Sequence, residues 1–541
     1  MTVEPRISPA SCSSSNETEA RRWLADFQRR MGRPLKVLHY GNIANNAYNN
    51  AKVQRAHGIE AHVAAPDYYH VMGCPEWEDA EIEGEIKDPF YPDFWSVNLN
   101  GFERPEWFVQ GPAQLCRSYL LHMATGNDRA RRLYWRYLQA YRYSLVKPHI
   151  RKLVNSSETT KANFKRLALF VERLAAGILN SGKMTLAETF RIDMEAENEM
   201  KRLSRQFANG GAGHELSREE FCAKHDVDPN DYDSFIIAAR QWLPVFRQYD
   251  IVMAYSTDPI WPFLAQVENY VAYEHGTIRE IPFQDDPVGR LTKRAYRAAP
   301  AVFITNVDNI RAADRLGLSE DQRFYLPHAF DCHKLLNYAQ KCGIGLDPEG
   351  PRQVFMPSRQ HWVDRDPNWA KGNDRVIRAA RLLKDEGYSP VIKFIEWGKD
   401  VEASKALIKE LGVEDMIVWS PMLNKQQLWE EYLRSTVVID QFLLPGISGV
   451  SFEAMTLGTP VITHDEDDLN ARFFGKAPPL LAASDPRQIA DQIKRLLDDD
   501  DLRAEIGRQS TRWILEYHSP ERIFDIQISA FRKVLKNAEH P

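Results

Sequence analysis

The sequence has few features of membrane, secreted or nucleic-acid-binding proteins. It contains no run of about eighteen apolar residues, the length that spans a bilayer, and its first residues lack the apolar core of a signal peptide. The net charge of −6 gives no overall basic surface for nucleic acid. The six cysteines form no CxxC pair and predict neither a zinc site nor a disulfide framework. We therefore expect a cytoplasmic protein with reduced cysteines and no nucleic-acid partner.

Motifs for metal-dependent and hydrolytic chemistry are also missing. Asp364-Arg365-Asp366 and Asp226-Val227-Asp228 fit a D-x-D pattern that binds a divalent metal in some transferases, but neither follows a clear strand. The stretch from Asp226 lacks the glycine and the terminal glutamate of a calcium loop. No G-x-S-x-G motif occurs, so a hydrolase is not indicated. We expect no essential metal ion and no bound cofactor.

The length and the strand pattern predict more than one α/β domain. A chain of 541 residues exceeds a single hydrophobic core. Residues 1–30 begin with a polar stretch, and we expect a mobile tail there. The first α/β domain is expected over 31–335, where apolar runs alternate with helical stretches; these runs are LKVLHYG, EAHVAA, IVMAYS, VAYEH, AVFITN and FYLP. Residues 113–245 interrupt this rhythm and predict a helical insertion.

The insertion contains a basic segment, 117–166. This segment holds twelve lysines and arginines, two acidic residues, several tyrosines and one tryptophan. Such a mixture favours peripheral contact with an anionic membrane at its inner face, or an anionic acceptor such as a lipid phosphate. A solvated basic face with core-facing aromatic side chains is the alternative.

A second α/β series is expected over 345–520, after a Gly- and Pro-containing linker. Its apolar runs are VFMPSR, VIKFIEWG, MIVWSP, TVVIDQF, PVITH and PLLAAS. In the first helix Val376, Ile377, Ala380 and Leu383 share one face, and Ser484-Asp485-Pro486 predicts a later helix start. We expect 521–541 to form a helix that packs back on the N-terminal domain. Two such domains place strand ends and loops on the walls of one cleft.

The segment IDQFLLPGISGVSFEAMTLGTPVITH, 439–464, contains the clearest candidate anion site. A predicted strand ends in a loop with Gly446 and Gly449 and runs directly into a helix that carries Glu453. Backbone N–H groups at such a helix start bind a diphosphate, and a carboxylate one turn later accepts hydrogen bonds from ribose. On pattern alone, a tight connection without a ligand is an equal alternative.

Several segments, in their order, resemble retaining glycosyltransferases of family four. SFEAMTLGTPVI resembles the family's EAMAxGxPVI signature, and SRQHWVDRDPNWAKGNDRVIRAARLL resembles its Arg-then-Lys-Gly segment. YEHG and FYLPHAFDCHKL resemble motifs of its N-terminal half. The resemblance covers 350–520 and, more weakly, 35–65 and 250–335. It implies the α/β fold called GT-B, in which two Rossmann-like domains face a central cleft, with a nucleotide-sugar as co-substrate.

The resemblance also implies roles for individual residues. Arg359 and Lys371 would neutralise the donor diphosphate, and His275 would contact the transferred sugar. Arg365 lies nearer the family's usual spacing to the lysine, but Arg359 ends an apparent strand and is preferred. The donor-binding candidates are Gly41, Asn42, Met422, Asp440, Gln441, Gly446, Ser448, Gly449 and Glu453.

One position departs from the family pattern. Pro445 stands where family members commonly carry a glutamate that holds the donor sugar. Asp440 and Gln441 are the candidates for that contact. We expect hexosyl transfer from a nucleotide-sugar to a glycan, lipid-linked or other acceptor, with retention. A nucleotide-sugar epimerase of the same architecture and a non-catalytic GT-B scaffold are the alternatives.

Overall fold

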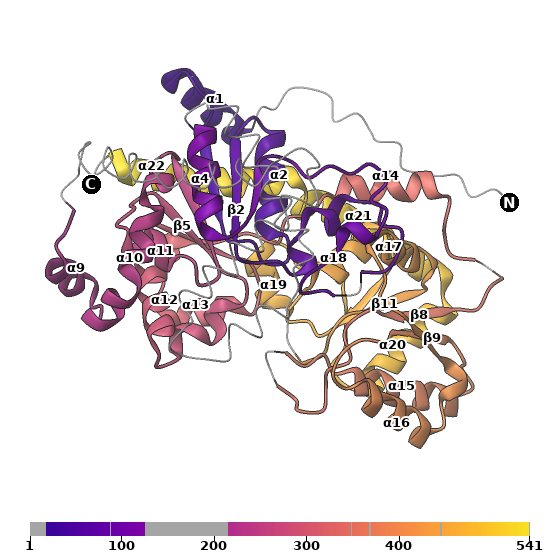
Figure 1. Ribbon diagram of the computed structural model, residues 1–541. Coiled ribbons are helices and arrows are strands. Elements are labelled where there is room, and N and C mark those ends of the chain that lie inside the picture. Colours follow the sequence, from indigo (N-terminus) through magenta and orange to yellow (C-terminus); the bar gives the residue numbers. More distant parts are fainter. Residues whose placement is uncertain are drawn as a thin grey trace.

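The computed structural model describes residues 18–539, apart from 87, 125–214, 348, 367–368 and 444–445. Two parallel sheets, of seven and six strands, organise the chain. Each sheet lies in its own lobe, and the colours show that each lobe is largely one half of the sequence (Figure 1). The expected pair of Rossmann-like domains is confirmed. Most of the expected helical insertion and of the basic segment 117–166 lies outside the described residues.

The N-terminal sheet has the strand order β3-β2-β1-β4-β5-β6-β7, and all neighbours are parallel. Its strands are β1 (Lys36–Tyr40), β2 (Glu60–Pro66), β3 (Phe108–Gly111), β4 (Ile251–Tyr255), β5 (Tyr270–Tyr273), β6 (Ala301–Ile304) and β7 (Arg323–Tyr325). The order reverses between β1 and β4, where the carboxyl ends of the strands open a crevice for ligands.

Helices cover both faces of this sheet, which explains why β4, β5 and β6 are buried at every position. The helices of residues 46–342 are α2 (Asn46–Ala56), α3 (Pro75–Asp79), α4 (Ala113–Ala124), α9 (Arg218–His225), α10 (Pro229–Phe246), α11 (Ile260–Leu264), α12 (Pro287–Ala298), α13 (Asn309–Leu316) and α14 (Cys332–Cys342), of which α14 packs on the C-terminal lobe. Single 3-10 turns span Val71–Gly73, Phe94–Ser96, Thr277–Arg279, Ile281–Phe283 and Glu320–Gln322.

The C-terminal sheet repeats the plan with the order β10-β9-β8-β11-β12-β13. Its strands are β8 (Gln353–Met356), β9 (Val391–Ile395), β10 (Ile417–Ser420), β11 (Val437–Ile439), β12 (Val461–Thr463) and β13 (Leu481–Ala482), and a 3-10 turn spans Glu414–Met416. Its helices are α15 (Asn373–Asp385), α16 (Val401–Leu411), α17 (Lys425–Arg434), α18 (Gly449–Thr456), α19 (Asp467–Phe474), α20 (Pro486–Asp498) and α21 (Asp500–Tyr517). No helix of the described ranges is long and apolar enough to cross a membrane.

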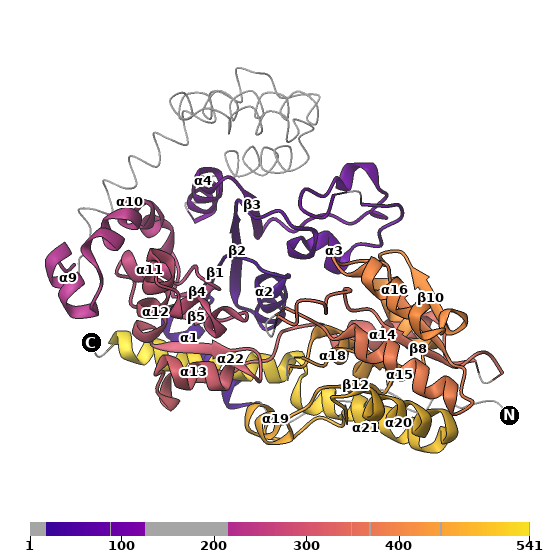
Figure 2. The same cartoon turned by 90° about the horizontal axis from the view of Figure 1, so that it is seen from below.

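The last helix, α22 (Pro520–Glu539), leaves the C-terminal lobe and lies along the N-terminal one (Figures 1 and 2). Its apolar side buries Phe524 and Phe531 in the core of the N-terminal sheet. Gln527 is fully buried there and exchanges hydrogen bonds with Asn50 and Gln54 of α2, at 2.7 and 3.1 Å. The chain thus links its two domains twice, through the segment after α14 and through α22.

The expected mobile tail over 1–30 is wrong for residues 19–30. These residues belong to helix α1 (Glu19–Met31), which buries Ala20, Leu24 and Phe27 on one face. This face packs in the same core as α22, and Thr18 donates a hydrogen bond to Asp525 of that helix at 3.1 Å. The polar residues that suggested a tail lie almost entirely before α1, whereas its apolar residues recur at the helical spacing.

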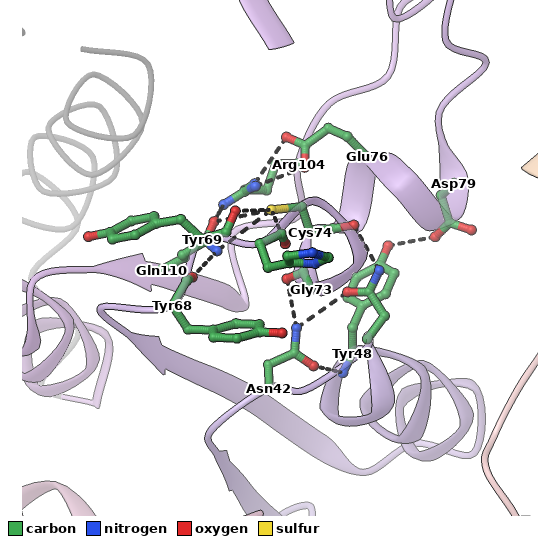
Figure 3. Close-up of polar contacts among 12 residues, drawn as sticks. Asn42, Tyr48, Tyr68, Tyr69, Gly73, Cys74, Glu76, Asp79, Arg104 and Gln110 are labelled. Atoms are coloured by element: carbon green, nitrogen blue, oxygen red, sulfur yellow. Dashed lines mark hydrogen bonds and ion pairs between the residues drawn. The ribbon is translucent and has the colours of Figure 1, made fainter. Parts of the chain in front are cut away.

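Residues 67–107 connect β2 to β3 and fold around a buried ion pair, shown in Figure 3. The Arg104 guanidinium donates to both carboxylate oxygens of Glu76, at 3.2 and 2.8 Å, and to Gln110 Oε1 at 2.6 Å. The Arg104 and Glu76 side chains are only 3% and 1% exposed. Neither charge reaches water, so each depends on the other for its stabilisation.

Replacing Glu76 with Gln is expected to lower the free energy of unfolding by about 3–5 kcal/mol, because Arg104 would stay buried without a counter-charge. Urea denaturation followed by circular dichroism measures this change. Glu85→Gln is the matched control, since the Glu85 side chain is exposed, and it should change the free energy by less than about 0.5 kcal/mol. Equal stabilities of the two variants would contradict the role of the ion pair.

Candidate functional site in the interdomain cleft

A cavity of about 630 Å³ lies between the two domains. Its N-terminal wall comes from segments that follow β1, β2, β4, β5, β6 and β7, and its C-terminal wall comes from loops that follow β8 and β11 and from the start of α17. The carboxyl ends of both sheets therefore face one cleft, which is where open parallel sheets bind ligands.

Two cations of the C-terminal wall approach each other after β8. Arg359 follows the strand end, and Lys371 precedes Gly372, the N-cap of α15, which has a φ of 77°. The Lys371 ammonium donates to Gln441 Oε1. The Arg359 guanidinium donates to the backbone oxygen of Trp369 at 2.8 Å and lies 5.9 Å from the centre of its ring. Neither cation forms an ion pair with any carboxylate of the described chain.

Burial acts strongly on both of these charges. It lowers the pKa of Lys371 to about 8, and although Asp440 opposes this shift, Arg359 and Arg279 add to it. Burial also lowers the pKa of Arg359. Two desolvated cations without a carboxylate partner form a site that an anion would stabilise.

Helix α18 begins beside these cations. Ser448 is its N-cap, and the Ser448 hydroxyl accepts a hydrogen bond from Val450 N at 3.2 Å. Ser448, Gly449 and Gly446 line the cavity, and no atom lies within 4 Å of the position that a Cβ on Gly449 would occupy. The first N–H groups of the helix have no partner inside it and carry the positive end of its dipole. The helix start and the two cations thus present positive charge to the same space.

Asp440 and Gln441, the two candidates beside Pro445, have different places. Gln441 lines the cavity, where it accepts from Lys371 and donates to Gly446 O at 2.8 Å. Asp440 is fully buried behind the loop and accepts from Ser448 N at 3.1 Å and Ser451 Oγ at 2.7 Å. Asp440 therefore shapes the loop and does not line the cavity. Pro445 lies outside the described residues.

Glu453 also lines the cavity, but it is already paired. Its carboxylate accepts from the ammonium of Lys425, the first residue of α17, and the two side chains are 8% and 21% exposed. Burial alone would lower the pKa of Lys425, but Glu453 and Glu78 raise it well above its ordinary value. Removing Glu453 would leave Lys425 buried and uncompensated, so variants of Glu453 change stability as well as binding.

His275 faces the cavity from the N-terminal wall. Its Nδ1 lies 3.1 Å from Asn46 Nδ2, and its ring centre lies 5.0 Å from that of His328. Burial, with a smaller contribution from Arg279, lowers the pKa of His275 to about 4. His275 is therefore a neutral imidazole at physiological pH.

The turn that presents His275 is fixed by the buried carboxylate of Glu274. Glu274 Oε2 accepts from Gly276 N at 2.6 Å and from Asn309 Nδ2. Glu274 Oε1 accepts from the backbone N–H and the hydroxyl of Thr305, both at 2.8 Å. This carboxylate joins the turn after β5 to the loop after β6, so the position of His275 depends on a charge that never reaches the cavity.

Three other predicted donor-site residues, Gly41, Asn42 and Met422, lie away from the cavity. The Asn42 side chain accepts hydrogen bonds from Ala47 N and Tyr48 N, at 3.1 and 3.3 Å, and donates one to Gly73 O at 2.9 Å (Figure 3). Gly41 has a φ of 90°, and a Cβ there would lie 2.2 Å from Asp258 Oδ2. Both residues therefore build the turn itself.

Asn46 and Asn49, further along the same loop and helix, line the cavity in place of Gly41 and Asn42. Met422 is 47% exposed on the loop after β10, the edge strand, and does not line the cavity.

Several residues that line the cavity were not predicted from the sequence. They are Glu78, Arg279, His328, Trp369 and Lys425. His328 lies within the FYLPHAFD segment and Trp369 within the long stretch between Arg359 and Lys371, so their segments carried a signal although the residues did not. Among the described residues no group of three His, Cys, Asp or Glu side chains is arranged to hold a metal ion.

Comparison with known proteins agrees with this arrangement. Residues 365–513 match the family model described as glycosyl transferases group 1. The match covers most of the C-terminal domain. The matched region includes Lys371, Lys425 and Glu453, and Arg359 lies just before it. The expected resemblance is confirmed for this part of the chain.

The individual relatives of this region have low sequence identity to it. The D-inositol 3-phosphate glycosyltransferase of Acidothermus cellulolyticus is 29% identical over 158 residues, which are 27% of this chain and 35% of that protein. This chain thus spans about a third of the length of the curated relatives it matches.

Two solved structures are similar in overall course. The apo structure of OtsA has a TM-score of 0.48 at 9% identity, over 92% of this chain and 99% of that one. Sucrose-phosphate synthase from Thermosynechococcus elongatus has a TM-score of 0.41 at 15% identity, over 56% and 80%.

Replacing Glu274 with Gln is expected to destabilise the fold by about 3 kcal/mol, because an amide nitrogen in place of one carboxylate oxygen would meet donors instead of accepting from them. Thermal and urea unfolding measure the loss. The exposed Glu268 gives a matched control, and Glu268→Gln should leave stability unchanged. A fully stable Glu274→Gln protein would show that the carboxylate does not hold this turn.

Proposed function

We propose that the protein transfers a hexosyl group from a nucleotide-sugar to an acceptor, with retention of the anomeric configuration. The observation that carries this proposal is the pair of desolvated cations, Arg359 and Lys371, which lack a carboxylate partner and lie beside the start of α18. The match of residues 365–513 to the group 1 family supports it. A diphosphate is the anion that fits such a site in this family.

In this proposal the donor diphosphate lies between the two cations and the start of α18, where the N–H of Gly449 donates to it. The sugar–phosphate bond breaks with negative charge gathering on the leaving diphosphate. Fixed cations and N–H donors aimed at that charge lower the barrier, and such electrostatic stabilisation is usually the largest catalytic contribution. Lys371 supplies a point charge and Arg359 a planar set of donors.

The remainder of the donor occupies both sides of the diphosphate. Glu453 accepts hydrogen bonds from the ribose hydroxyls, and Lys425 then shares the carboxylate with the ligand. Gln441, which lines the cavity, takes the contact that the family glutamate makes, and it holds the donor sugar together with the neutral His275. A neutral imidazole suits contact with sugar hydroxyls because it both donates and accepts a hydrogen bond.

Retention follows from the family resemblance. We infer that an oxygen of the leaving diphosphate takes the proton of the attacking hydroxyl, because His275 has a pKa too low for efficient proton uptake at neutral pH. The anomeric proton signal of the product in ¹H NMR tests whether the configuration is retained. An inverted product would contradict it.

Replacing Lys371 with Met is expected to weaken binding of the preferred nucleoside diphosphate by about 10- to 100-fold, the loss of one charge-assisted hydrogen bond. Calorimetry with UDP, GDP, ADP, CDP and dTDP, without metal, first identifies that nucleotide. Lys409→Met is the control, because Lys409 is exposed on α16. If no nucleotide binds the unaltered protein at millimolar concentration, the donor site is wrongly assigned.

The pH dependence of nucleotide binding should report Lys371 directly. Its pKa in the free protein is about 8, and a bound diphosphate favours its charged form. Affinity should therefore be level well below pH 8 and fall above it, with a slope that approaches about tenfold per pH unit. Calorimetry at constant ionic strength measures this profile.

Lys371→Arg is the matched variant for the pH profile, since arginine keeps its charge throughout this range. Its affinity should stay level where that of the unaltered protein falls. Titration of the nucleotide itself affects both proteins equally. Parallel profiles for the two proteins would contradict the assignment of Lys371.

A further inference from the structure

The two walls of the cleft differ in charge. The C-terminal wall carries Arg359 and Lys371 without carboxylate partners, whereas the cation that lines the described N-terminal wall, Arg279, is bound by Asp308, with Nη2 and Oδ1 3.0 Å apart. Glu78 also lines the N-terminal wall. That wall, as far as the structure describes it, offers no unpaired arginine or lysine to an anionic group.

The histidines of the N-terminal wall do not supply positive charge either. Burial lowers the pKa of His275 to about 4 and that of His328 well below its ordinary value, and Arg279 adds to both shifts. Both rings are therefore neutral near pH 7. Asn46 and Asn49 complete this side of the wall with uncharged amides that donate and accept hydrogen bonds.

An aromatic surface continues the N-terminal wall beyond the cavity. Met72 lines the cavity and is 39% exposed. The neighbouring Val71 donates its N–H to Pro89 O at 2.6 Å, which places residues 69–72 beside 89–91. Phe90 and Tyr91 are 65% and 49% exposed there. We call Tyr69, His70, Met72, Phe90 and Tyr91 the aromatic edge.

The rings of the aromatic edge support one another. The centres of His70 and Phe90 are 5.1 Å apart with nearly perpendicular planes, and those of Tyr69 and Tyr91 are 6.1 Å apart in a stack. Aromatic side chains held in this way lose little conformational entropy when a ligand covers them. Exposed apolar and aromatic side chains that gather beside a cleft indicate a binding surface.

The segment that carries the aromatic edge is strongly acidic. Residues 68–93 contain eight aspartates and glutamates and a single lysine. Some of these acids are neutralised, such as Glu76 by Arg104 and Asp79 by Lys52 and Lys334. The remaining excess of negative charge repels phosphate groups and anionic lipid surfaces. The occupant of the aromatic edge must therefore be uncharged or basic.

We propose that the acceptor is a neutral glycan, whose sugar units leave the cleft across the aromatic edge. This inference rests on the proposed glycosyl transfer. A pyranose ring has an apolar face of C–H groups that packs on aromatic rings, and hydroxyls that donate to carboxylates such as Glu78 and to amides such as Asn46 and Asn49. Both properties match what the N-terminal wall and the aromatic edge provide.

The test compares glycan binding by the unaltered protein and by the double variant Phe90→Ala/Tyr91→Ala. The probes are hexasaccharides of glucose, mannose, galactose and N-acetylglucosamine, each with and without a terminal phosphate, measured by saturation-transfer NMR and calorimetry. At least one neutral hexasaccharide should bind, its phosphorylated form should bind no better, and the double variant should weaken the neutral one about tenfold or more.

Controls separate the possible failures. The control variant Ile237→Ala removes an apolar side chain of α10 that is 73% exposed, and it should leave glycan binding unchanged. If the double variant does not fold, the single variants Phe90→Ala and Tyr91→Ala replace it. Preference for the phosphorylated forms, no binding of any neutral hexasaccharide, or unchanged binding by the aromatic variants overturns the inference. Nucleoside diphosphate binding, measured on the same samples, does not depend on the aromatic edge. If the unaltered protein binds no nucleoside diphosphate, the proposed glycosyl transfer itself is contradicted.

Discussion

Two partly buried cations without a counter-ion are the constraint around which the cleft is built. Removing Lys371 from water lowers its pKa to about 8, which means that its charge is costly in the empty protein. The surroundings hold it with a neutral amide from Gln441 and not with a carboxylate. By contrast, the nearby Lys425 is satisfied by Glu453. An anionic ligand at Lys371 and Arg359 would supply the charge that the fold leaves out.

The rest of the architecture keeps these groups in place. Both sheets direct the carboxyl ends of their strands into the cleft, so residues distant in sequence share one cavity. Glu274 fixes the turn that carries His275. A chain of buried hydrogen bonds joins Gln527 of α22 to Gln54, His39 and Tyr255. These hydrogen bonds connect α22 to α2, and α2 carries Asn46 and Asn49 to the cavity.

Much of this arrangement could be predicted because it depends on periodic burial and local caps. The apolar strands were predicted from runs that both faces of a covered sheet require. Val376, Ile377, Ala380 and Leu383 are fully buried, and Asp485 caps α20, as their spacing indicated. Strand β3 was missed because it has four residues at the sheet edge and little pattern. Helix α1 was missed because the polar residues before it dominated the composition.

The site was predictable by segment but less by residue. Whether Asp440 or Gln441 faces the cavity depends on which side of the chain the loop after β11 turns, and this is set by Ser448 and Ser451. In the same way, the turn after β1 directs Asn42 into the turn itself and Asn46 toward the cavity. Lys425 reaches Glu453 from another helix. Such contacts depend on tertiary packing and have no signature in a single sequence.

The most direct test is a crystal structure of the protein with the nucleoside diphosphate that binds it most tightly. We expect the terminal phosphate to lie within hydrogen-bond distance of Lys371 Nζ and of a backbone N–H at the start of α18, with the ribose at Glu453. A nucleotide bound outside the cleft, or within it with its phosphates away from Lys371, would contradict the assignment of the donor site.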